Sequence, residues 1–203
     1  MSAILAIDAA GASFAVALLV DDVVVREVVS DTTRDHSRKL LPAIGDVMGS
    51  MAVHLDAVAV IRGPGSYAGV RVGLAAAAGF AMARALPIIG IGTLEAVGAA
   101  AGPGTWVATH PAGRGTVAAQ LYRDGVAAGP LHTAAERGVF DWPTAGEGAA
   151  PAGGREVTTL ERCRAAARLA PARLASAEYA IPSALYLRDP HITAPRTRPA
   201  IAS

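Results

Sequence analysis

A glycine-rich turn that joins a buried strand to a long, small-residue helix constrains this chain more than any other feature. The apolar run Ala57–Ile61 leads into the turn Arg62–Gly73, and an apolar stretch from Val70 to Leu86 leaves it. This order predicts a strand, a tight turn and a helix N-terminus, with Ser66 as the N-cap. Backbone N–H groups at such a turn lie at the positive end of a helix dipole, so the turn could hold an anion.

The turn has features of two nucleotide-binding motifs but satisfies neither. A P-loop is excluded, because no pair of glycines here has its spacing with a lysine after the second. The Rossmann pattern is nearly matched by Gly63-x-Gly65-x-x-Ala68, but Pro64 lies inside the turn and no acid ends the next strand, Ile88–Ile91. A tight strand-to-helix connection is the favoured interpretation. As a nucleophile Ser66 is disfavoured, because the turn lacks the G-x-S-x-G pattern.

The helix after the turn carries a face of very small residues. Gly69, Gly73, Ala77 and Ala81 recur every four positions and therefore share one side. Because glycine inside a helix costs about 0.8–1 kcal/mol relative to alanine, the pattern indicates that another backbone approaches closely. Two partners remain open at this point: the protein's own sheet, or a helix of another chain. A membrane span is not expected, since charged residues and a proline interrupt the run.

Composition narrows the possible functions. Hydrophobic residues make up 52% of the 203 residues, which is enough for a core. A net charge of +1 argues against a dedicated nucleic-acid-binding module. Cys163 is the single cysteine, so neither a disulfide framework nor a thiolate metal cluster is expected. Asp8 interrupts the first apolar run and no basic segment precedes it, so we expect no signal peptide and a cytoplasmic location.

The order of elements predicts an α/β protein. Strands are expected at Ala3–Ile7, Phe14–Val20 and Val23–Val29, as an antiparallel meander with a turn at Asp21-Asp22. A helix over His36–Met51 follows; Asp35 could cap it, and Pro42 should start or bend it. After the strand Ile88–Ile91, a helix over Thr93–Ala101 capped by Thr93 is expected. Three meander strands, a helix, a strand, a helix and a strand form the order of an RNase H-like half-domain.

The second part of the chain is less regular. The sequence Gly102-Pro103-Gly104 suggests a boundary between a first half, 1–101, and a smaller second half, 102–188. Strands are expected at Trp106–Thr109 and Thr116–Tyr122, with a hairpin turn at Arg123-Asp124-Gly125. Glu136–Gly154 is expected to be loop, Leu160–Leu169 a helix with a basic face, and residues 189–203 a proline-rich tail.

Few residues have the spacing that catalysis needs. Asp8 ends the first strand, where an acid of actin-like enzymes holds a metal or its water, but no further acid could be placed beside it. A structural role for Asp8 is therefore favoured. No histidine pair has metalloprotease spacing. The histidines are His36, His54, His110, His132 and His191.

Several motifs resemble one family when they are taken together and in order. They resemble the TsaB (formerly YeaZ) family, accessory subunits of bacterial tRNA threonylcarbamoyladenosine synthesis. The matching motifs are dense over residues 3–101 and fragmentary beyond that range. The motifs are Ile4-Leu5-Ala6-Ile7-Asp8, His36-Ser37-x-x-Leu40-Leu41-Pro42, the turn Arg62–Gly73, Gly92-Thr93-Leu94-Glu95-Ala96, Gly146-Glu147-Gly148-Ala149 and Leu185-Tyr186-Leu187-Arg188.

The resemblance implies an actin-like (ASKHA) fold of two RNase H-like halves, of which the second is degenerate here. It also implies a non-catalytic subunit that pairs with TsaD, the paralogue that transfers the threonylcarbamoyl group, and that recruits TsaE, a P-loop ATPase. No cofactor of its own is expected: ATP and magnesium belong to the partners, and a nucleotide at the joint with TsaD stays open. Contact with tRNA is expected only through the complex. Whether the free protein is a monomer or a homodimer stays open.

One departure from the family's pattern concerns the start of the second half. Where the family usually has an acid, an alanine and two arginines, this chain has Thr109-His110-Pro111-Ala112-Gly113-Arg114-Gly115, which puts the role of this loop in doubt. The alternatives from other classes are a small actin-like ATP-binding kinase or ATPase and a nucleic-acid-binding module.

The resemblance implies that the two helices on either side of Ala57–Ile61 pack side by side against the matching helices of TsaD, or against themselves when TsaD is absent. The interface expected from it comprises His36, Leu40, Leu41, Ile44, Val47, Met48, Tyr67, Gly69, Val70, Arg71, Gly73, Leu74, Ala77 and Ala81. No catalytic or metal-binding residue is expected.

Overall fold

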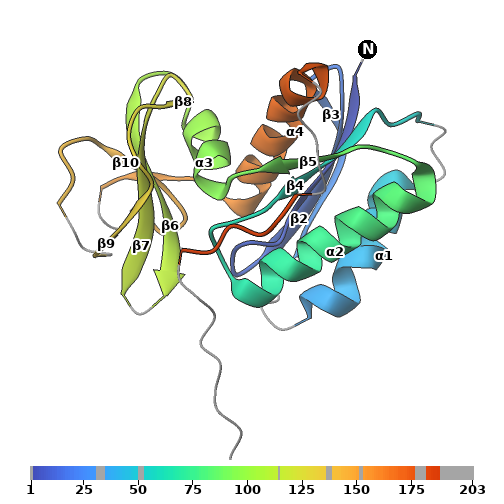
Figure 1. The fold of residues 1–203 in the computed structure, drawn as a ribbon, viewed down its shortest axis with the longest axis horizontal. Helices are drawn as coiled ribbons and strands as arrows, with labels where there is room; N and C mark the ends of the chain where they lie inside the picture. The colour runs from blue at the N-terminus through green and yellow to red at the C-terminus, as the bar shows by residue number, and fades with distance from the viewer. Residues whose placement is uncertain are drawn as a thin grey trace, which may run out of the picture.

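The computed structural model contains two β-sheets with helices packed on them (Figure 1). It describes residues 2–30, 35–49, 53–113, 115–135, 139–150, 153–176 and 182–187. The first sheet has the strand order β3-β2-β1-β4-β5, and the second runs β11-β10-β6-β7-β8, with β9 also paired to β7. The expectation of an α/β fold of two related halves is confirmed.

The first sheet follows the predicted meander. The strands β1 (Ala3–Asp8), β2 (Phe14–Val20) and β3 (Val23–Ser30) are antiparallel neighbours. Asp21 and Asp22 have φ angles of 48° and 68°, as a two-residue hairpin turn requires. Strand β4 (Ala57–Ile61) lies parallel to β1, and β5 (Ile88–Ile91) lies parallel to β4. This is the strand arrangement of an RNase H-like half, as the sequence predicts.

Helices cover both faces of the first sheet. Helices α1 (His36–Met48) and α2 (Tyr67–Arg84) contact each other and pack on one face. Helix α4 (Thr159–Ala175) packs on the other face. Strand β1 serves both layers, because Leu5 and Ile7 point towards α1 and α2 while Ile4 and Ala6 point towards α4. The prediction that the first two helices lie side by side on one face is confirmed (Figure 1).

The second sheet repeats the topology of the first in reduced form. It comprises β6 (Thr105–Gly113), β7 (Thr116–Arg123), β8 (Val126–Ala127), β9 (His132–Ala135), β10 (Thr144–Gly146) and β11 (Arg155–Glu156). Strand β7 is antiparallel to both β9 and β6. Strand β10 pairs with β6 in parallel, and β11 pairs with β10 in parallel. Within the described residues no helix separates β9 from β10 or β10 from β11, so this half is degenerate. The segment expected to be loop contains the short strand β10.

The two halves exchange helices. Helix α3 (Thr93–Ala101) follows the first sheet but packs on the second, where Leu94 and Val97 join a core with Tyr122. Helix α4 follows the second sheet but packs on the first. The boundaries 1–101 and 102–188 therefore stay predictions, and the tail 189–203 lies outside the described residues.

Helix ends confirm the predicted cap at Ser66, correct the one at Thr93, and show Asp35 at the N-cap of α1 without a side-chain bond. The Ser66 hydroxyl accepts the Gly69 N–H at 3.2 Å, as predicted. The N-cap of α3 is Gly92, whose N–H donates to the Glu95 carboxylate. The prediction that Thr93 caps this helix is therefore wrong. Asp35 precedes α1 without a side-chain cap bond, and Pro42 lies inside that helix. None of the helices in the described ranges has the length and hydropathy of a membrane span.

Candidate functional site

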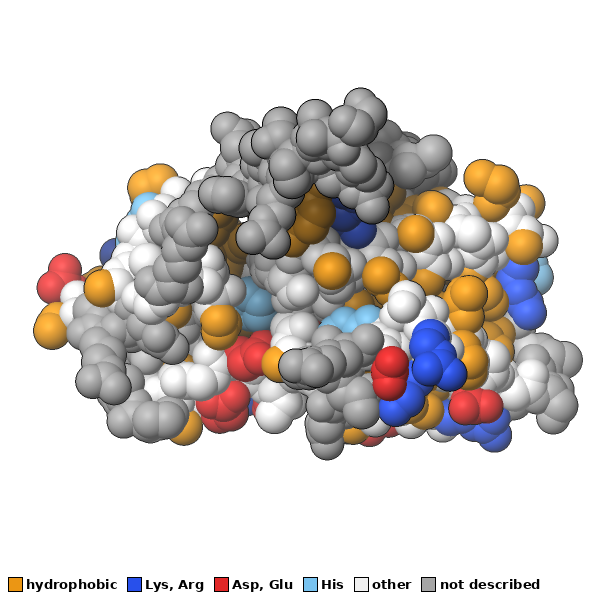
Figure 2. All heavy atoms as spheres, turned by 90° about the horizontal axis from the view of Figure 1, so that it is seen from below, with side chains coloured by type: hydrophobic (Ala, Val, Ile, Leu, Met, Phe, Trp, Pro, Cys, Tyr) orange, Lys and Arg blue, Asp and Glu red, His pale blue; other side chains and the backbone are white. Residues whose placement is uncertain are grey.

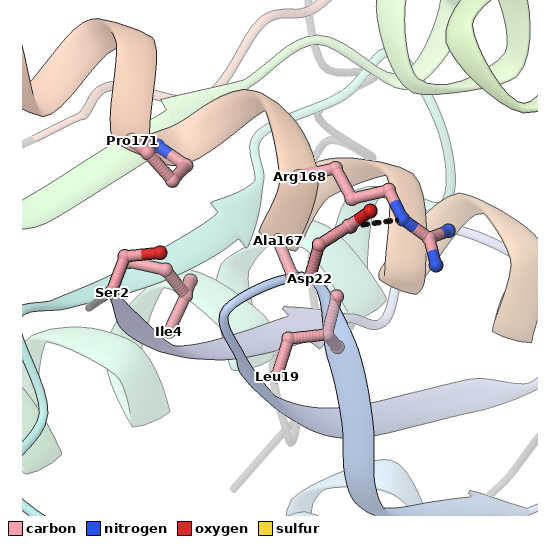
Figure 3. Close-up of a pocket in the computed structure, with 7 residues that line it drawn as sticks. All are labelled: Ser2, Ile4, Leu19, Asp22, Ala167, Arg168 and Pro171. Atoms are coloured by element: carbon pink, nitrogen blue, oxygen red, sulfur yellow. Dashed lines mark hydrogen bonds and ion pairs between the residues drawn. The ribbon is translucent and has the colours of Figure 1, made fainter.

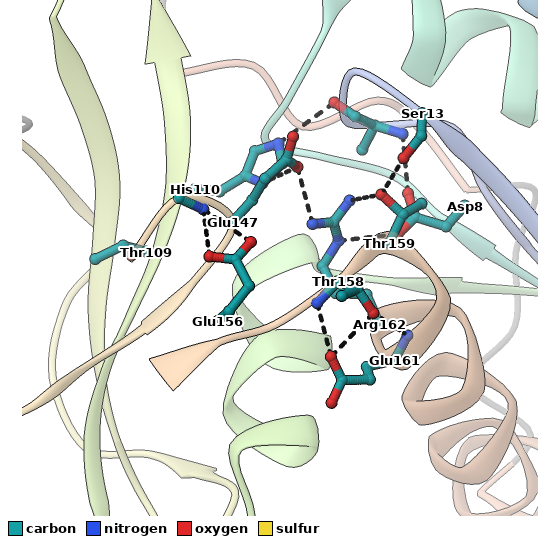
Figure 4. Close-up of polar contacts among 12 residues, drawn as sticks. Asp8, Ser13, Thr109, His110, Glu147, Glu156, Thr158, Thr159, Glu161 and Arg162 are labelled. Atoms are coloured by element: carbon teal, nitrogen blue, oxygen red, sulfur yellow. Dashed lines mark hydrogen bonds and ion pairs between the residues drawn. The ribbon is translucent and has the colours of Figure 1, made fainter. Parts of the chain in front are cut away.

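A buried charged cluster lies where the two sheets meet, and Arg162 on α4 is at its centre (Figure 4). The Arg162 Nε donates to Asp8 Oδ2 at 2.9 Å and its Nη1 donates to Glu147 Oε2 at 3.0 Å. Its third nitrogen, Nη2, donates to the Thr159 hydroxyl at 3.2 Å. Asp8 and Arg162 are both 0% exposed, so this ion pair is shielded from solvent. One guanidinium therefore binds acids from both halves.

Glu147 is the acid that the second half contributes, since it follows β10 and reaches the loop after β1. A Cβ atom at Gly11 would lie 2.6 Å from Glu147 Oε2, so any other residue there would require the carboxylate to shift. Burial favours a raised pKa for Glu147, but the charge of Arg162 and hydrogen bonds from Arg162 and the Ala12 backbone outweigh it, and the pKa is lowered. Glu147 is therefore an anion at neutral pH.

His110 on β6 completes the cluster as a neutral group. It is 2% exposed, and its Nε2 lies 3.3 Å from the Ala10 carbonyl oxygen, a backbone group of the other half. Burial first, and the positive charge of Arg162 second, lower its pKa to about 4. Its Nδ1 has no hydrogen-bond partner and lies 3.7 Å from Glu147 Oε2. The imidazole therefore stays uncharged at neutral pH.

The chemistry open to this cluster is limited by its internal contacts. One carboxylate oxygen of Asp8 accepts a hydrogen bond from the Arg162 guanidinium, and the other accepts one from the Ala10 N–H at 2.9 Å. Burial favours a lowered pKa for Arg162, but the charges of the two carboxylates outweigh this effect and raise the pKa. Arg162 therefore stays charged and cannot act as a general acid at neutral pH. Within the described residues no group of three or more ligating side chains could hold a metal.

The predicted small-residue face is internal. A Cβ atom at Gly69 would overlap the carbonyl oxygen of Ala9, and one at Gly73 would lie 3.4 Å from the Ala9 Cβ. Ala77 and Ala81 are 0% and 1% exposed. The close approach expected from the glycines is real, but the partner is the loop after β1 in the same chain. These four residues are therefore buried within the chain, and their assignment to an interface with another chain stays a prediction that this burial does not support.

Most of the expected α1 residues are also buried. Leu40, Ile44, Val47 and Met48 belong to the core of the first sheet, and so do not need a second chain to cover them. His36 and Val70 are buried too, and Leu74 is half-buried. The expected interface residues that are exposed are Leu41, Tyr67 and Arg71.

A different surface of the two helices is open, and we call it the outer face. Leu41 and Met82 are 59% and 80% exposed on it. Cβ atoms at Gly45 and Gly79 would meet nothing within 4 Å. Figure 2 shows hydrophobic side chains at the surface on the side where α1 and α2 lie. The outer face comprises Leu41, Gly45, Arg71, Ala75, Gly79 and Met82.

An aromatic contact adjoins the start of α2. The rings of Tyr67 and Tyr186 are 5.0 Å apart, and the Arg71 guanidinium lies 5.2 Å from the centre of the Tyr67 ring. The backbone N–H of Leu185 donates to the Arg62 carbonyl at 2.7 Å, which brings the C-terminal motif onto the glycine-rich turn. Tyr67 and Tyr186 are 44% and 37% exposed, so both remain accessible.

A small pocket lies between α4 and the start of β1 (Figure 3), with a volume of about 110 Å³. Its charged groups are Arg168 and Asp22, which bond each other at 2.6 Å at its exposed rim. Because these charges are already paired, the pocket offers no group to fix a ligand. The other residues that line it are Ser2, Ile4, Leu19, Ala167 and Pro171.

The sequence placed Asp8 but missed its partners. Arg162 was assigned to a basic face of a helix, and Glu147 to a loop. Arg162 is 154 positions from Asp8 in the chain, and no local pattern reports such a contact. Arg114, of the altered loop, lies outside the described residues.

Comparisons with known proteins agree on one family. Residues 24–130 match the family described as "TsaD: tRNA N6-adenosine threonylcarbamoyltransferase". The chain is 39% identical over 94 residues to the tRNA threonylcarbamoyladenosine biosynthesis protein TsaB of Escherichia coli K12, covering 45% of this chain and 40% of that protein. It is 33% identical over 99 residues to the TsaB of Bacillus subtilis, covering 47% of this chain and 43% of that protein.

A solved structure extends the similarity to the whole fold. A Pseudomonas aeruginosa protein described as similar to peptidase YEAZ superposes with a TM-score of 0.78 and 25% identity, over 93% of this chain and 100% of that one. The sequence matches, in contrast, span only about two-fifths of the length of the two curated relatives.

Proposed function

Because the chain belongs to the TsaD family, and within it to the TsaB (YeaZ) relatives, we propose that it is the non-catalytic subunit of a bacterial tRNA N6-threonylcarbamoyladenosine complex. In this proposal it pairs with TsaD, which transfers the threonylcarbamoyl group, and it recruits the ATPase TsaE. It acts in the cytoplasm and meets tRNA only inside the complex.

The observation that carries the non-catalytic assignment is the buried Asp8–Arg162 pair. In an actin-like enzyme the acid at this place would bind a metal or its water, whereas here both of its oxygens are bonded within the chain. The Arg162 guanidinium that binds Asp8 is 0% exposed, which supports a structural role for Asp8. We therefore assign ATP and magnesium to the partners, with a nucleotide at the joint between TsaD and this chain as a further proposal.

The surface proposed for TsaD is the outer face of α1 and α2. Exposed Gly45, Ala75 and Gly79 leave room for the helices of a partner to approach closely. Leu41 and Met82 supply exposed apolar area beside them. Arg71 and the tyrosine pair supply the residue types that dominate binding energy at many interfaces. A homodimer through the same face is proposed for the free protein.

The test is reconstitution with TsaD and TsaE from the same organism, with tRNA and a threonylcarbamoyl donor in excess. Omission of this chain should abolish or strongly reduce threonylcarbamoyladenosine formation on tRNA, measured by mass spectrometry of the nucleosides. Leu41→Asp on the outer face should reduce it too, whereas Val126→Asp, at a 70% exposed position of the second sheet, should leave it unchanged. Equal product with and without the chain would refute the proposed function.

A further inference from the structure

The loop after β1 is arranged around a carboxylate that comes from the other half of the molecule. Residues 9–13 connect β1 to β2 and face Glu147 across the junction of the sheets (Figure 4). Three features converge on that carboxylate: the Arg162 Nη1 at 3.0 Å, a backbone hydrogen bond from Ala12 and the missing side chain of Gly11. A charged donor, an N–H group and a space without a Cβ atom are the elements of an anion site.

The donor of this site is held in place without Glu147. Arg162 is fixed by Asp8 at 2.9 Å and by Thr159 at 3.2 Å, and Thr159 in turn bonds Ser13 at 2.6 Å. These groups belong to β1, to the loop that follows it or to α4, which packs on the first sheet. Arg162 is therefore held on the first sheet, where it presents a preformed cation to the second sheet.

We propose that the 9–13 loop and Arg162 form an anion-binding site, that the Glu147 carboxylate is its occupant, and that this occupancy latches the second sheet onto the first. The chain supplies its own ligand at the junction of the two sheets, which helix α3 also spans by packing on α4 and on the second sheet. The His110 contact with the Ala10 carbonyl lies beside the latch and also spans the two halves. The angle between the halves is then set without any ligand from solution.

Chemical rescue tests this proposal. Glu147→Ala removes the atoms of one acetate ion and leaves the donors in place. We expect the melting temperature to fall by roughly 5–10 °C in chloride. Acetate at the same ionic strength should restore most of that loss, because it can refill the site. Free acetate is not tethered to the second half, so it should not restore closure.

Closure is measured by the distance between two spin labels. Cysteines at Val23 and Val126, which are 65% and 70% exposed, place one label on each sheet. Cys163 is 0% exposed and stays unlabelled. The distance distribution should broaden in Glu147→Ala with and without acetate. Glu147→Asp should broaden it too, because the shorter side chain keeps the charge but does not span the gap.

Glu27→Ala is the matched control. Glu27 and Glu147 are both 25% exposed and both bind an arginine of α4, but the Glu27–Arg164 pair joins β3 to α4 and does not involve the second sheet. Its loss should leave the label distances unchanged, and acetate should not raise its melting temperature more than chloride does. If acetate stabilises both variants equally, or if Glu147→Ala keeps the wild-type label distances, the latch is refuted. If Glu147→Ala folds in neither salt while Glu147→Gln matches wild type in both assays, the charged site is refuted as well.

Discussion

Two alanines of α2, two positions apart, separate the internal face of the helix from its outer face. Ala77 is 0% exposed within the core of the first sheet, whereas Ala75 is exposed. Ala77→Leu adds three carbon atoms to a packed region, and overpacking of this kind costs about 1–3 kcal/mol. For a protein of this size the melting temperature should fall by about 2–12 °C. Ala75→Leu should change stability by less than about 0.5 kcal/mol.

Binding to TsaD should respond in the opposite way. A leucine at position 75 would separate two closely approaching helices, and a loss of about 1–3 kcal/mol there weakens binding about 5–150-fold. Thermal denaturation followed by circular dichroism and titration calorimetry with TsaD measure the two effects. If Ala75→Leu binds as tightly as wild type, or if it unfolds as readily as Ala77→Leu, the outer face is wrongly assigned.

Three further predictions concern the core and the charged cluster. Gly69→Ala should lower the free energy of unfolding by about 2–3 kcal/mol in chemical denaturation, because its Cβ would overlap the Ala9 carbonyl oxygen; wild-type stability would contradict this packing. The unfolded chain protonates His110 near pH 6.5 but the folded chain only near pH 4, so stability should fall by about 2–3 kcal/mol as pH drops through that range, and His110→Gln should flatten the profile. Burial raises the pKa of Cys163, so this thiol should react with a thiol reagent only after denaturation; fast reaction of the folded protein would contradict its burial.

The first half was predictable because its signals are local. Alternating and continuous apolar runs marked β1 to β5, and Asp21-Asp22 marked the first hairpin. Helix α4 begins one residue before its predicted start and ends six after its predicted end, because packing on the first sheet extends it past Leu169. Strand β10 was missed because three residues are held in the sheet mainly by their pairing with β6, which composition does not report.

The site was less predictable than the fold. The small-residue pattern of Gly69, Gly73, Ala77 and Ala81 correctly indicated a close backbone approach. Periodicity does not tell whether the approaching backbone belongs to the same chain, and here it is that of Ala9. The Asp8–Arg162–Glu147 cluster depends on tertiary packing of three separate elements, so the arginine pattern of α4 alone pointed to solvent.

The most direct test of the proposed role is the rate of threonylcarbamoyl transfer from an added donor to tRNA by TsaD and TsaE at increasing concentrations of this chain. If the chain is a non-catalytic partner, the rate should rise and saturate at one chain per TsaD, and Asp8→Asn that remains folded should saturate at the same rate. The same rate without the chain would contradict the account. So would an Asp8→Asn protein that is folded and binds TsaD but supports no transfer, since Asp8 would then take part in the chemistry.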